Sequence, residues 1–398
     1  MSRSADRGRR RAAHLEIAGT TLLVLAIVLA IVLVLVHHRT SSSAESSSAS
    51  PRADEAARTA AESVAAPPRI RHVFVVNIEN KGFRTTWGKH SRAPYLAKTL
   101  RARGVLLTQY YGTAHHSLGN YLAQISGQGP TYAIQHDCPR YTRFQEEGAV
   151  RAPQQVYGNG CVYPKKVDTL AGQLDRAGLS WRGYLQDMAR PCQHSRLGAK
   201  ERWARGTRHQ QYATRHNPFM YFRSITSRPT YCRAHVKPLE ALAHDLKRKS
   251  TTRTLSYISP DLCHDAHDAR CADGGPGGLR AANTWFRNWV PKILRSPAFR
   301  ANGMLVITAD ESEGVREDSR GCCGEGAGPN SGRPGIDGPG GGRIGALVIA
   351  PRFVGPGSAT STPYNHYSLL GSIEDLFGLK RLGYAVTVKA TFGDDVYN

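Results

Sequence analysis

Two apolar runs of this chain end in adjacent oxygen-bearing side chains, and this pattern restricts the folds that the chain can adopt. Glu79 and Asn80 follow residues 72–78, and Asp310 and Glu311 follow residues 303–309. Short apolar runs of this kind predict buried strands. Because ligands of an open α/β sheet gather at the carboxyl ends of parallel strands, we expect both pairs to face one shared site. Ordinary polar strand ends are the alternative for either pair alone.

From residue 71 onward, short apolar runs alternate with helical patterns. The predicted strands are His72–Ile78, Val105–Tyr110, Ser180–Leu185, Thr254–Ser259, Met304–Thr308 and Ile344–Ala350. The predicted helices are Pro94–Ala102, Val167–Ala177, Pro238–Lys247, Leu279–Leu294 and Tyr367–Phe377. This alternation predicts an α/β domain in which crossover helices join parallel strands.

The amino-terminal part has the composition of a membrane anchor. Residues 17–36 are an uncharged apolar run, long enough to cross a bilayer core of about 30 Å. A signal peptide would have a shorter apolar region and a small-residue cleavage site, whereas His37, His38 and Arg39 follow this run. We therefore expect an uncleaved transmembrane helix at 17–36.

The flanking residues predict its orientation. Residues 1–16 form a basic tail rich in arginine, which predicts a cytoplasmic amino terminus in a single-pass cell-membrane protein. Residues 37–68 are rich in Ser and Ala and have linker composition. Residues 69–398 are then one extracytoplasmic domain, large enough for its own core.

Cysteine usage agrees with an extracytoplasmic domain. The chain has eight cysteines, and their even number predicts structural disulfides in an oxidising compartment. Their connectivity is not predictable from spacing. Cys322-Cys323 lacks a second pair at zinc-ribbon spacing, so we expect no structural zinc site.

The charge of the chain points to anionic partners. Its formal net charge is +22 at pH 7, which favours phosphate esters, anionic lipid headgroups, wall polymers or nucleic acid. Because no module that reads RNA or DNA is recognisable, we expect no dedicated nucleic-acid partner. The glycine-rich segment 312–343 lacks the Gly-Lys-Ser/Thr ending of a P-loop and is interpreted as a mobile loop over the site.

Between about Arg71 and Leu379 the chain resembles the phosphoesterase family of bacterial acid phosphatases and phosphatidylcholine-type phospholipases C, in the alkaline phosphatase superfamily. The resemblance is carried by motifs in family order: Glu79-Asn80-Lys81, His116-Ser117-x-x-Asn120-Tyr121, His216-Asn217-Pro218-Phe219, Tyr257–Asp268, Thr308–Glu311 and Asn365–Gly378. One departure is Gly119, where the family usually has proline. The implied fold is a three-layer α/β/α sandwich around a mostly parallel sheet.

The resemblance also implies a divalent metal ion. Its implied ligands are Glu79, Asn80, Ser117, Asp310 and Glu311. Such oxygen ligands suit Mg²⁺, Ca²⁺ or Mn²⁺, and histidine ligands would admit Zn²⁺ or iron. A second metal site formed by Asp261, His264 and His366 is an open alternative.

The remaining site residues follow from the same motifs. Ser117 is the implied nucleophile, which a bound cation would activate, with His216 and His267 as further catalytic groups. The implied substrate-binding residues are His116, Asn120, His264 and His366. Asp265 and Asp268 are expected to orient the adjacent histidines.

Together these features predict a membrane-anchored, extracytoplasmic, metal-dependent phosphomonoesterase of the acid phosphatase type, with phosphoinositides and other lipid phosphates among its candidate substrates. One alternative is a phospholipase C-like phosphodiesterase. That branch usually has additional carboxy-terminal domains, whereas this chain ends soon after Leu379. The other alternative is a non-catalytic basic module that binds the cell wall or lipids, but such a module has no need of a nucleophile beside a metal shell. The oligomeric state is not predicted.

Overall fold

A computed structural model of the protein describes residues 69–397. The predicted basic tail, membrane anchor and linker lie outside these residues. Within 69–397, no helix combines the length and apolarity needed to cross a membrane.

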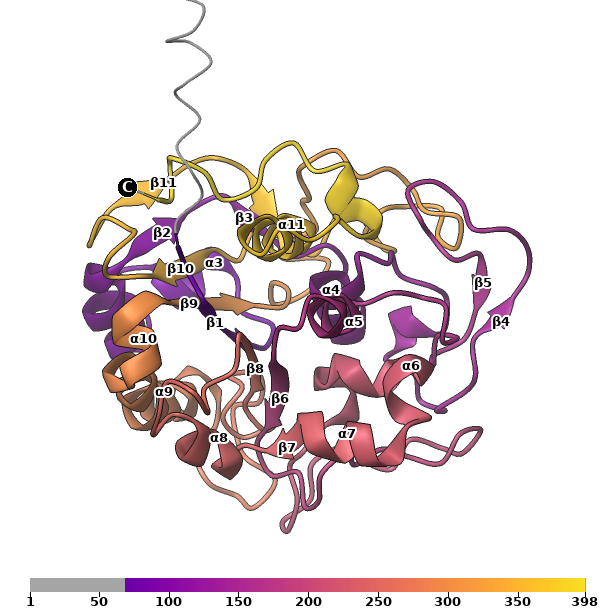
Figure 1. Ribbon diagram of the computed structural model, residues 1–398, viewed down its shortest axis with the longest axis horizontal. Coiled ribbons are helices and arrows are strands. Elements are labelled where there is room, and N and C mark those ends of the chain that lie inside the picture. The colour runs from indigo at the N-terminus through magenta and orange to yellow at the C-terminus, as the bar shows by residue number, and fades with distance from the viewer. Residues whose placement is uncertain (1–68, 398) are drawn as a thin grey trace, which may run out of the picture. The chain divides into compact units, whose positions relative to one another are not determined.

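The centre of the domain is an eight-stranded sheet with the strand order β11-β2-β10-β9-β1-β8-β6-β7 (Figure 1). Its strands are β1 (His72–Ile78), β2 (Val105–Leu107), β6 (Trp181–Leu185), β7 (Val236–Pro238), β8 (Leu255–Ser259), β9 (Gly303–Ala309), β10 (Ala346–Ile349) and β11 (Ala359–Thr360). Two short pairs lie outside it: β3 (Tyr110–Tyr111) with β12 (Tyr364–Asn365), and β4 (Gln145–Glu146) with β5 (Gly158–Asn159).

The sheet is mostly parallel, as predicted. β1 lies between β8 and β9 and is parallel to both. In the register with β9, Ile78 is opposite Ala309, so the two strands end side by side. Only β10 runs against its neighbours β2 and β9. The residues that follow β1 and β9 therefore emerge at the same edge of the sheet.

Helices lie against both faces of the sheet. Successive side chains of a strand point to opposite faces, and in β1 the ring of Phe74 packs against Phe299 of α10, whereas Asn77 is hydrogen-bonded to Gln124 of α4. The helices are α3 (Phe83–Trp87), α4 (Ser117–Ser126), α5 (Leu170–Arg176), α6 (Arg223–Thr226), α7 (Pro229–His235), α8 (Glu240–Asp245), α9 (Gly278–Arg295), α10 (Pro297–Asn302) and α11 (His366–Leu376). Shorter helical turns cover 95–103, 134–136, 214–216, 218–221 and 383–386.

All six predicted strands coincide with observed ones, but two predicted elements differ in detail. The predicted strand Val105–Tyr110 is divided into β2 and β3, because Thr108 turns to bond the backbone of Thr360. The predicted helix 94–102 is a π-helical segment at 95–100 followed by a 3₁₀ turn at 101–103. Several short elements, among them β7, α6, α7 and α10, were not predicted.

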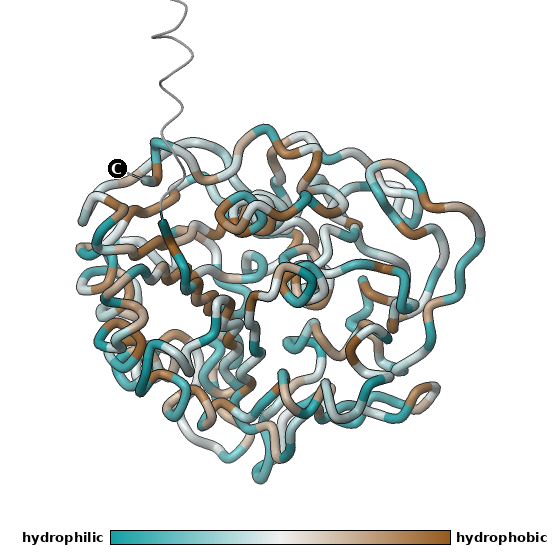
Figure 2. Tube along the Cα trace, viewed as in Figure 1, coloured by the Kyte–Doolittle hydropathy of each residue, from teal (hydrophilic) through white to brown (hydrophobic). Residues whose placement is uncertain are grey.

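The central strands are buried on both faces. All seven residues of β9 are buried, and so are six of the seven residues of β1. Figure 2 shows hydrophobic residues along these central strands, as expected for a parallel sheet covered on both sides.

All eight cysteines are paired, in agreement with the prediction. The disulfides are Cys138–Cys161, Cys192–Cys232, Cys263–Cys271 and the vicinal pair Cys322–Cys323. The segment 312–343 contains neither a helix nor a strand, which agrees with its assignment as a loop.

Candidate active site

Ser117 is the first residue of α4, directly after a residue in an unusual backbone conformation. His116 has φ 71° and ψ 131°, a positive φ that is costly for a residue with a side chain and is often found at functional sites. Helix amino termini favour negative groups, and the next amide of α4, Leu118 N, donates to Asp137 Oδ1 at 3.0 Å. The nucleophile candidate therefore lies where a helix presents its positive end.

Glu79 connects β1 to the start of α4. Ser117 Oγ donates a hydrogen bond to Glu79 Oε2 at 2.6 Å, and the Tyr121 hydroxyl donates to Glu79 Oε1. Burial, followed by repulsion from Asp310 and Asp265, raises the pKa of Glu79 well above its usual value. A nearby positive charge would relieve this repulsion.

Asn80 and Asp310 meet at the ends of β1 and β9. The amide of Asn80, a residue with φ 42°, donates to Asp310 Oδ1 at 2.9 Å. The side-chain atoms Asn80 Oδ1 and Asp310 Oδ2 are both buried without a hydrogen-bond partner. Burial also raises the pKa of Asp310.

These groups fit a divalent cation. Unpartnered buried oxygen atoms cost free energy, and carboxylates that repel one another are stabilised by a bound positive charge. Asn80, Asp310 and Glu79 together offer the oxygen ligands that hard cations prefer. Four of the five predicted ligands are thus linked in pairs at the ends of β1 and β9, Asn80 with Asp310 and Glu79 with Ser117.

Glu311, the fifth predicted ligand, lines the same cleft as Glu79 and contacts a histidine. Its Oε2 is hydrogen-bonded to His115 Nδ1, and His115 Nε2 lies 3.0 Å from the carbonyl oxygen of Asp318. The side chains of Glu311 and His115 are both almost fully buried. Because of burial, the pKa of Glu311 is raised and the pKa of His115 is lowered.

His216 lies between two carboxylates. Its Nε2 is 3.3 Å from Glu79 Oε2, and its Nδ1 is 3.7 Å from Asp265 Oδ2. Its ring stacks on Tyr121 with centroids 5.4 Å apart and an interplanar angle of 6°. The ring is buried, yet both nitrogens lack a hydrogen-bond partner in the described residues. The structure thus brings this predicted catalytic residue to the site.

Asn120 was expected to contact substrate, but in this structure it organises the loop before Ser117. Its Oδ1 accepts from Thr113 N, Thr113 Oγ1 and Ala114 N at 2.8–3.0 Å. Its Nδ2 donates to the carbonyl oxygens of Ala114 and His116. Both Oδ1 and Nδ2 of this amide are therefore already hydrogen-bonded. Its role as a hydrogen-bond donor to phosphate stays a prediction.

His366 was also expected to bind substrate, but it is buried behind Asp310. Its Nε2 lies 2.6 Å from the carbonyl oxygen of Asp310, so this nitrogen carries the proton. Its Nδ1 then accepts from the Tyr110 hydroxyl and Gln124 Nε2. Burial lowers its pKa to about 4, which keeps the ring neutral. These contacts support the backbone of a metal-ligand candidate and leave no ring nitrogen for substrate.

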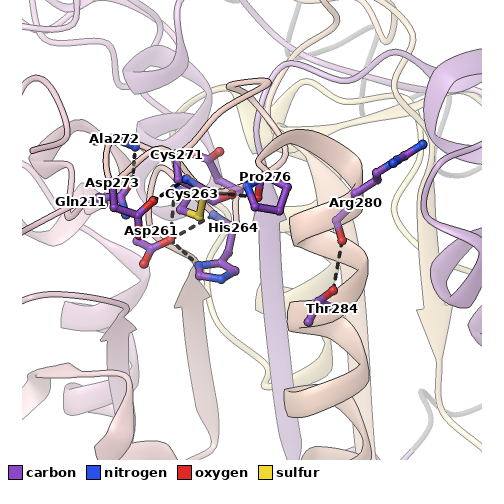
Figure 3. The surroundings of a disulfide bond; sticks show 12 residues. Gln211, Asp261, Cys263, His264, Cys271, Ala272, Asp273, Pro276, Arg280 and Thr284 are labelled. Atoms are coloured by element: carbon purple, nitrogen blue, oxygen red, sulfur yellow. Dashed lines mark hydrogen bonds and ion pairs between the residues drawn. A yellow bond between two sulfur atoms is a disulfide. The ribbon is translucent and has the colours of Figure 1, made fainter. Parts of the chain in front are cut away.

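His264 and Asp261 form a separate cluster beyond β8 (Figure 3). His264 Nδ1 lies 2.7 Å from Asp261 Oδ1 and 3.1 Å from Gln186 Nε2. Cys263 completes a group of metal-ligand types with them, but its sulfur is committed to the disulfide with Cys271. The contacts of this cluster and those of His366 have no residue in common, so nothing in the geometry supports the alternative second metal site.

The two aspartates expected to orient histidines behave differently. Asp268 Oδ1 lies 2.7 Å from His267 Nδ1, as expected. Asp265 instead accepts the backbone amide of His267 with Oδ1 and faces His216 with Oδ2. The histidine ring nearest its side chain therefore comes from another part of the fold, which sequence proximity could not indicate.

Of the predicted site residues, Glu79, Asn80, His116, Ser117, His267 and Glu311 line one cleft of about 410 Å³. It is lined by Glu79, Asn80, His116, Ser117, His136, Asp137, Pro139, Glu201, Ala204, Arg205, Arg215, His267 and Glu311. Sequence analysis missed Tyr121, His115, Asp137 and Arg215 as contributors to the site. Tyr121 lies within a motif already recognised, so its position one turn after Ser117 could have suggested it; the other three carry no local signal.

The chain is similar to known proteins that are named for the hydrolysis of phosphate esters. The Phosphoesterase family profile matches residues 89–380. An acid phosphatase of Aspergillus fumigatus is 24% identical over 289 residues, which are 72% of this chain and 51% of the fungal protein. A phosphatidylinositol-3-phosphatase of Mycobacterium tuberculosis is 24% identical over 325 residues, 81% of this chain and 82% of that protein.

The chain spans about half the length of the fungal acid phosphatases that it matches. Among solved structures, a protein in the alkaline phosphatase superfamily from Vibrio parahaemolyticus is 12% identical, with a TM-score of 0.44. The match covers 83% of this chain and 73% of that one.

Proposed function

This chain belongs to the phosphoesterase family, and we propose that it hydrolyses phosphate monoesters with Ser117 as the nucleophile. The observation that carries the proposal is that Ser117, Glu79 and Asn80 line one cleft and that Asn80 is bonded to the buried Asp310, with oxygen atoms of Asn80 and Asp310 left without partners. A non-catalytic binding module would need neither the strained entry to α4 nor a hydroxyl bonded to a buried carboxylate.

In this proposal, Ser117 accepts the phosphoryl group, and a neighbouring side chain takes the proton of its hydroxyl. The Ser117 hydroxyl donates to Glu79 Oε2, which is therefore the atom nearest to hold its proton as Oγ attacks phosphorus. The new bond is Oγ–P, and the bond to the leaving oxygen breaks. A divalent cation held by Glu79, Asn80, Asp310 and Glu311 would supply Lewis-acid neutralisation of negative charge. Water then hydrolyses the phosphoserine and restores the hydroxyl.

The leaving oxygen needs a proton, and His267 is the candidate donor. Its ring lines the cleft, and its Nδ1 is held by Asp268 at 2.7 Å, which leaves Nε2 for proton transfer. His216 lies deeper, against Glu79, and we assign it the orientation of that carboxylate.

Monoesters are favoured over diesters because of charge. A monoester presents almost two negative charges on three terminal oxygens and so requires more positive groups than a diester. Arg205 and Arg215 line the same cleft, and the net charge of the chain is +22. Because a relative is named a phosphatidylinositol-3-phosphatase, we include phosphoinositides among the candidate substrates. The predicted membrane anchor at 17–36 would hold the domain at a membrane surface outside the cytoplasm.

The direct test is Ser117→Ala compared with Ser126→Ala. Both serines are buried on α4, but Ser126 Oγ bonds local backbone groups, as a donor to Leu122 O and an acceptor from Gln128 N. We expect Ser117→Ala to lower kcat for phosphate release at least about a thousandfold, with an unchanged circular dichroism spectrum, and Ser126→Ala to keep kcat within about twofold. Near-normal turnover by Ser117→Ala would refute the serine mechanism. Release of phosphocholine from phosphatidylcholine, without phosphate from monoesters, would establish the phospholipase C alternative.

Removal of metal tests the proposed requirement for a divalent cation. Dialysis against a chelator should abolish phosphate release, and one of Mg²⁺, Ca²⁺, Mn²⁺ or Zn²⁺ should restore it. Asp310→Asn should weaken binding of that ion measured by calorimetry, because it removes one charge from the ligand set. Full activity in excess chelator would contradict the metal requirement.

A further inference from the structure

Three exposed rings continue from the proposed nucleophile to the surface. His116 precedes Ser117, and its ring lies nearly parallel to that of His136, with centroids 6.3 Å apart and an interplanar angle of 19°. The ring of His136 packs in turn against Tyr132, with centroids 4.7 Å apart. His116 and His136 line the cleft, and Tyr132 is 64% exposed. We call these three residues the ring wall.

The polar contacts of the ring wall leave its ring faces uncovered: His116 Nε2 lies 3.9 Å from Asp337 Oδ2, and His136 Nδ1 lies 2.7 Å from the Tyr132 carbonyl oxygen. Exposed aromatic rings offer apolar area and negative ring faces that a ligand can cover. The rings belong to the edge of the molecule and contribute nothing to the buried core. Their position beside Ser117 gives them a natural occupant, namely the part of a substrate that lies beyond the phosphate.

The segment that carries the ring wall is firmly attached to the nucleophile helix. Residues 134–136 form a 3₁₀ turn, and the following Cys138 is joined to Cys161. Asp137 accepts the amide of Leu118 in α4 at 3.0 Å, and Ala133 N donates to Asn159 Oδ1 at 3.0 Å. A surface held in this way loses little conformational entropy when a ligand packs against it.

The hydrogen bonds of His136 also fix its ring. Its Nδ1 lies 2.7 Å from the carbonyl oxygen of Tyr132, so Nδ1 carries a proton and the ring is oriented by the backbone. Arg205 and Arg215 line the same cleft, and Arg215 Nε lies 3.8 Å from Oδ2 of Asp137, the residue that follows His136. The cleft therefore combines cationic groups, suited to phosphate, with aromatic rings, suited to a flat group.

From this arrangement we propose that the ring wall is the leaving-group subsite and that the preferred substrates are phosphate monoesters carried by a ring. This inference rests on the proposed function and specifies its substrate class. An aromatic ring would stack on Tyr132 and His136. A cyclitol such as inositol would place its partly positive C–H bonds over the negative faces of the same rings. An open-chain leaving group would make fewer of these contacts.

The first experiment measures binding without turnover. Benzylphosphonate and n-pentylphosphonate carry the same charged group, and only the first has a ring. We expect calorimetry to show that the wild-type protein binds benzylphosphonate about threefold to tenfold more tightly, the range of an aromatic contact. Tyr132→Ala and His136→Ala should each remove most of this preference, and Tyr132→Phe should keep it. Val386→Ala, another exposed apolar side chain at 49% exposure, is the matched control and should also keep it.

The second experiment identifies the kind of ring. myo-Inositol 1-phosphate and glycerol 2-phosphate are both esters of secondary alcohols, so the ratio of their kcat/KM values reports the ring more than the leaving-group chemistry. A Tyr132-dependent preference for the inositol ester assigns a cyclitol substrate, and a preference confined to the benzyl compound assigns an aromatic one. Equal affinities within both pairs, or a preference that survives Tyr132→Ala and His136→Ala, would overturn the subsite.

The measurements distinguish an error in the subsite proposal from an error in the proposed function. Phosphate release without ring preference would leave the phosphomonoesterase intact and remove the subsite. Ring-selective binding of benzylphosphonate without hydrolysis of any ester would support the subsite and refute the catalytic proposal.

Discussion

Asp265 connects three parts of the cleft through three different atoms. Its carbonyl oxygen accepts the amide of Glu79 at 2.6 Å, and its Oδ1 accepts the amide of His267 at 2.9 Å. Its Oδ2, which has no hydrogen-bond partner, lies 3.7 Å from His216 Nδ1. Burial raises its pKa to about 8. The Asp265 side chain thus lies directly behind the His216 ring, at a distance longer than a hydrogen bond.

We therefore predict that Asp265→Asn lowers kcat about tenfold to a hundredfold while His216→Gln has a similar effect. Because both substitutions interrupt one Asp265–His216 contact, the double variant should lose little more than either single variant. Asp268→Asn, which alters the exposed contact with His267, is the comparison for a neighbouring carboxylate. Strictly additive losses in the double variant would show that Asp265 and His216 act independently.

At the scale of elements, the buried acid Glu374 of α11 binds the backbone of the segment that follows the helix. Glu374 Oε1 accepts the amide of Leu382 at 3.1 Å, whereas its Oε2 has no partner among the described residues. Burial raises the pKa of Glu374 from its ordinary 4.5 to about 9. The folded chain therefore keeps a proton on Glu374 at neutral pH that the unfolded chain releases.

The sign of the pH effect follows from this difference. A raised acid pKa gives stability that is complete below about pH 4.5 and is lost as the pH rises toward about 9. Glu374→Gln, which cannot ionise, should flatten this part of the stability profile and raise the free energy of unfolding at pH 8 more than at pH 5. Urea unfolding at the two pH values measures this. Asp375→Asn, whose side chain pairs with Arg381 at 2.7 Å, should not flatten the profile, and a parallel profile for Glu374→Gln would contradict the prediction.

At the scale of the whole molecule, the four disulfides should contribute unequally. In the loop-entropy account, a disulfide stabilises more when it closes a longer loop. Cys192–Cys232 spans 40 residues, whereas Cys322–Cys323 joins neighbours. Replacing both cysteines of the first pair by serine should lower the free energy of unfolding by about 3–4 kcal/mol, and the same change in the second pair should cost much less. Equal losses would show that loop closure is not the dominant contribution.

Truncation tests the predicted organisation of the chain. The described domain begins at residue 69, and residues 69–397 have a buried core and a cleft of their own. A protein that starts at Arg69 should therefore be soluble and keep the kcat of the full chain. In intact cells, added protease should cut the predicted linker at 37–68. Cutting only after lysis would reverse the predicted orientation.

Local sequence patterns were sufficient to predict the strands and to predict that the residues at the ends of β1 and β9 lie close together. Hydrophobic runs identify β1 and β9, and parallel pairing brings Glu79, Asn80 and Asp310 to one edge, because strands of the same direction end together. The motif around Ser117 likewise anticipated the residue at the start of α4.

Only the tertiary structure decided which polar side chains remain available for chemistry. Asn120 and His366 belong to recognised motifs, yet their hydrogen bonds are taken up by the 113–116 loop and by the Asp310 backbone. Asp265 and His216 are 49 positions apart in the numbering, and no spacing rule relates them. Whether a buried polar atom is already bonded depends on residues brought near by the fold, and local sequence carries no information about those long-range partners.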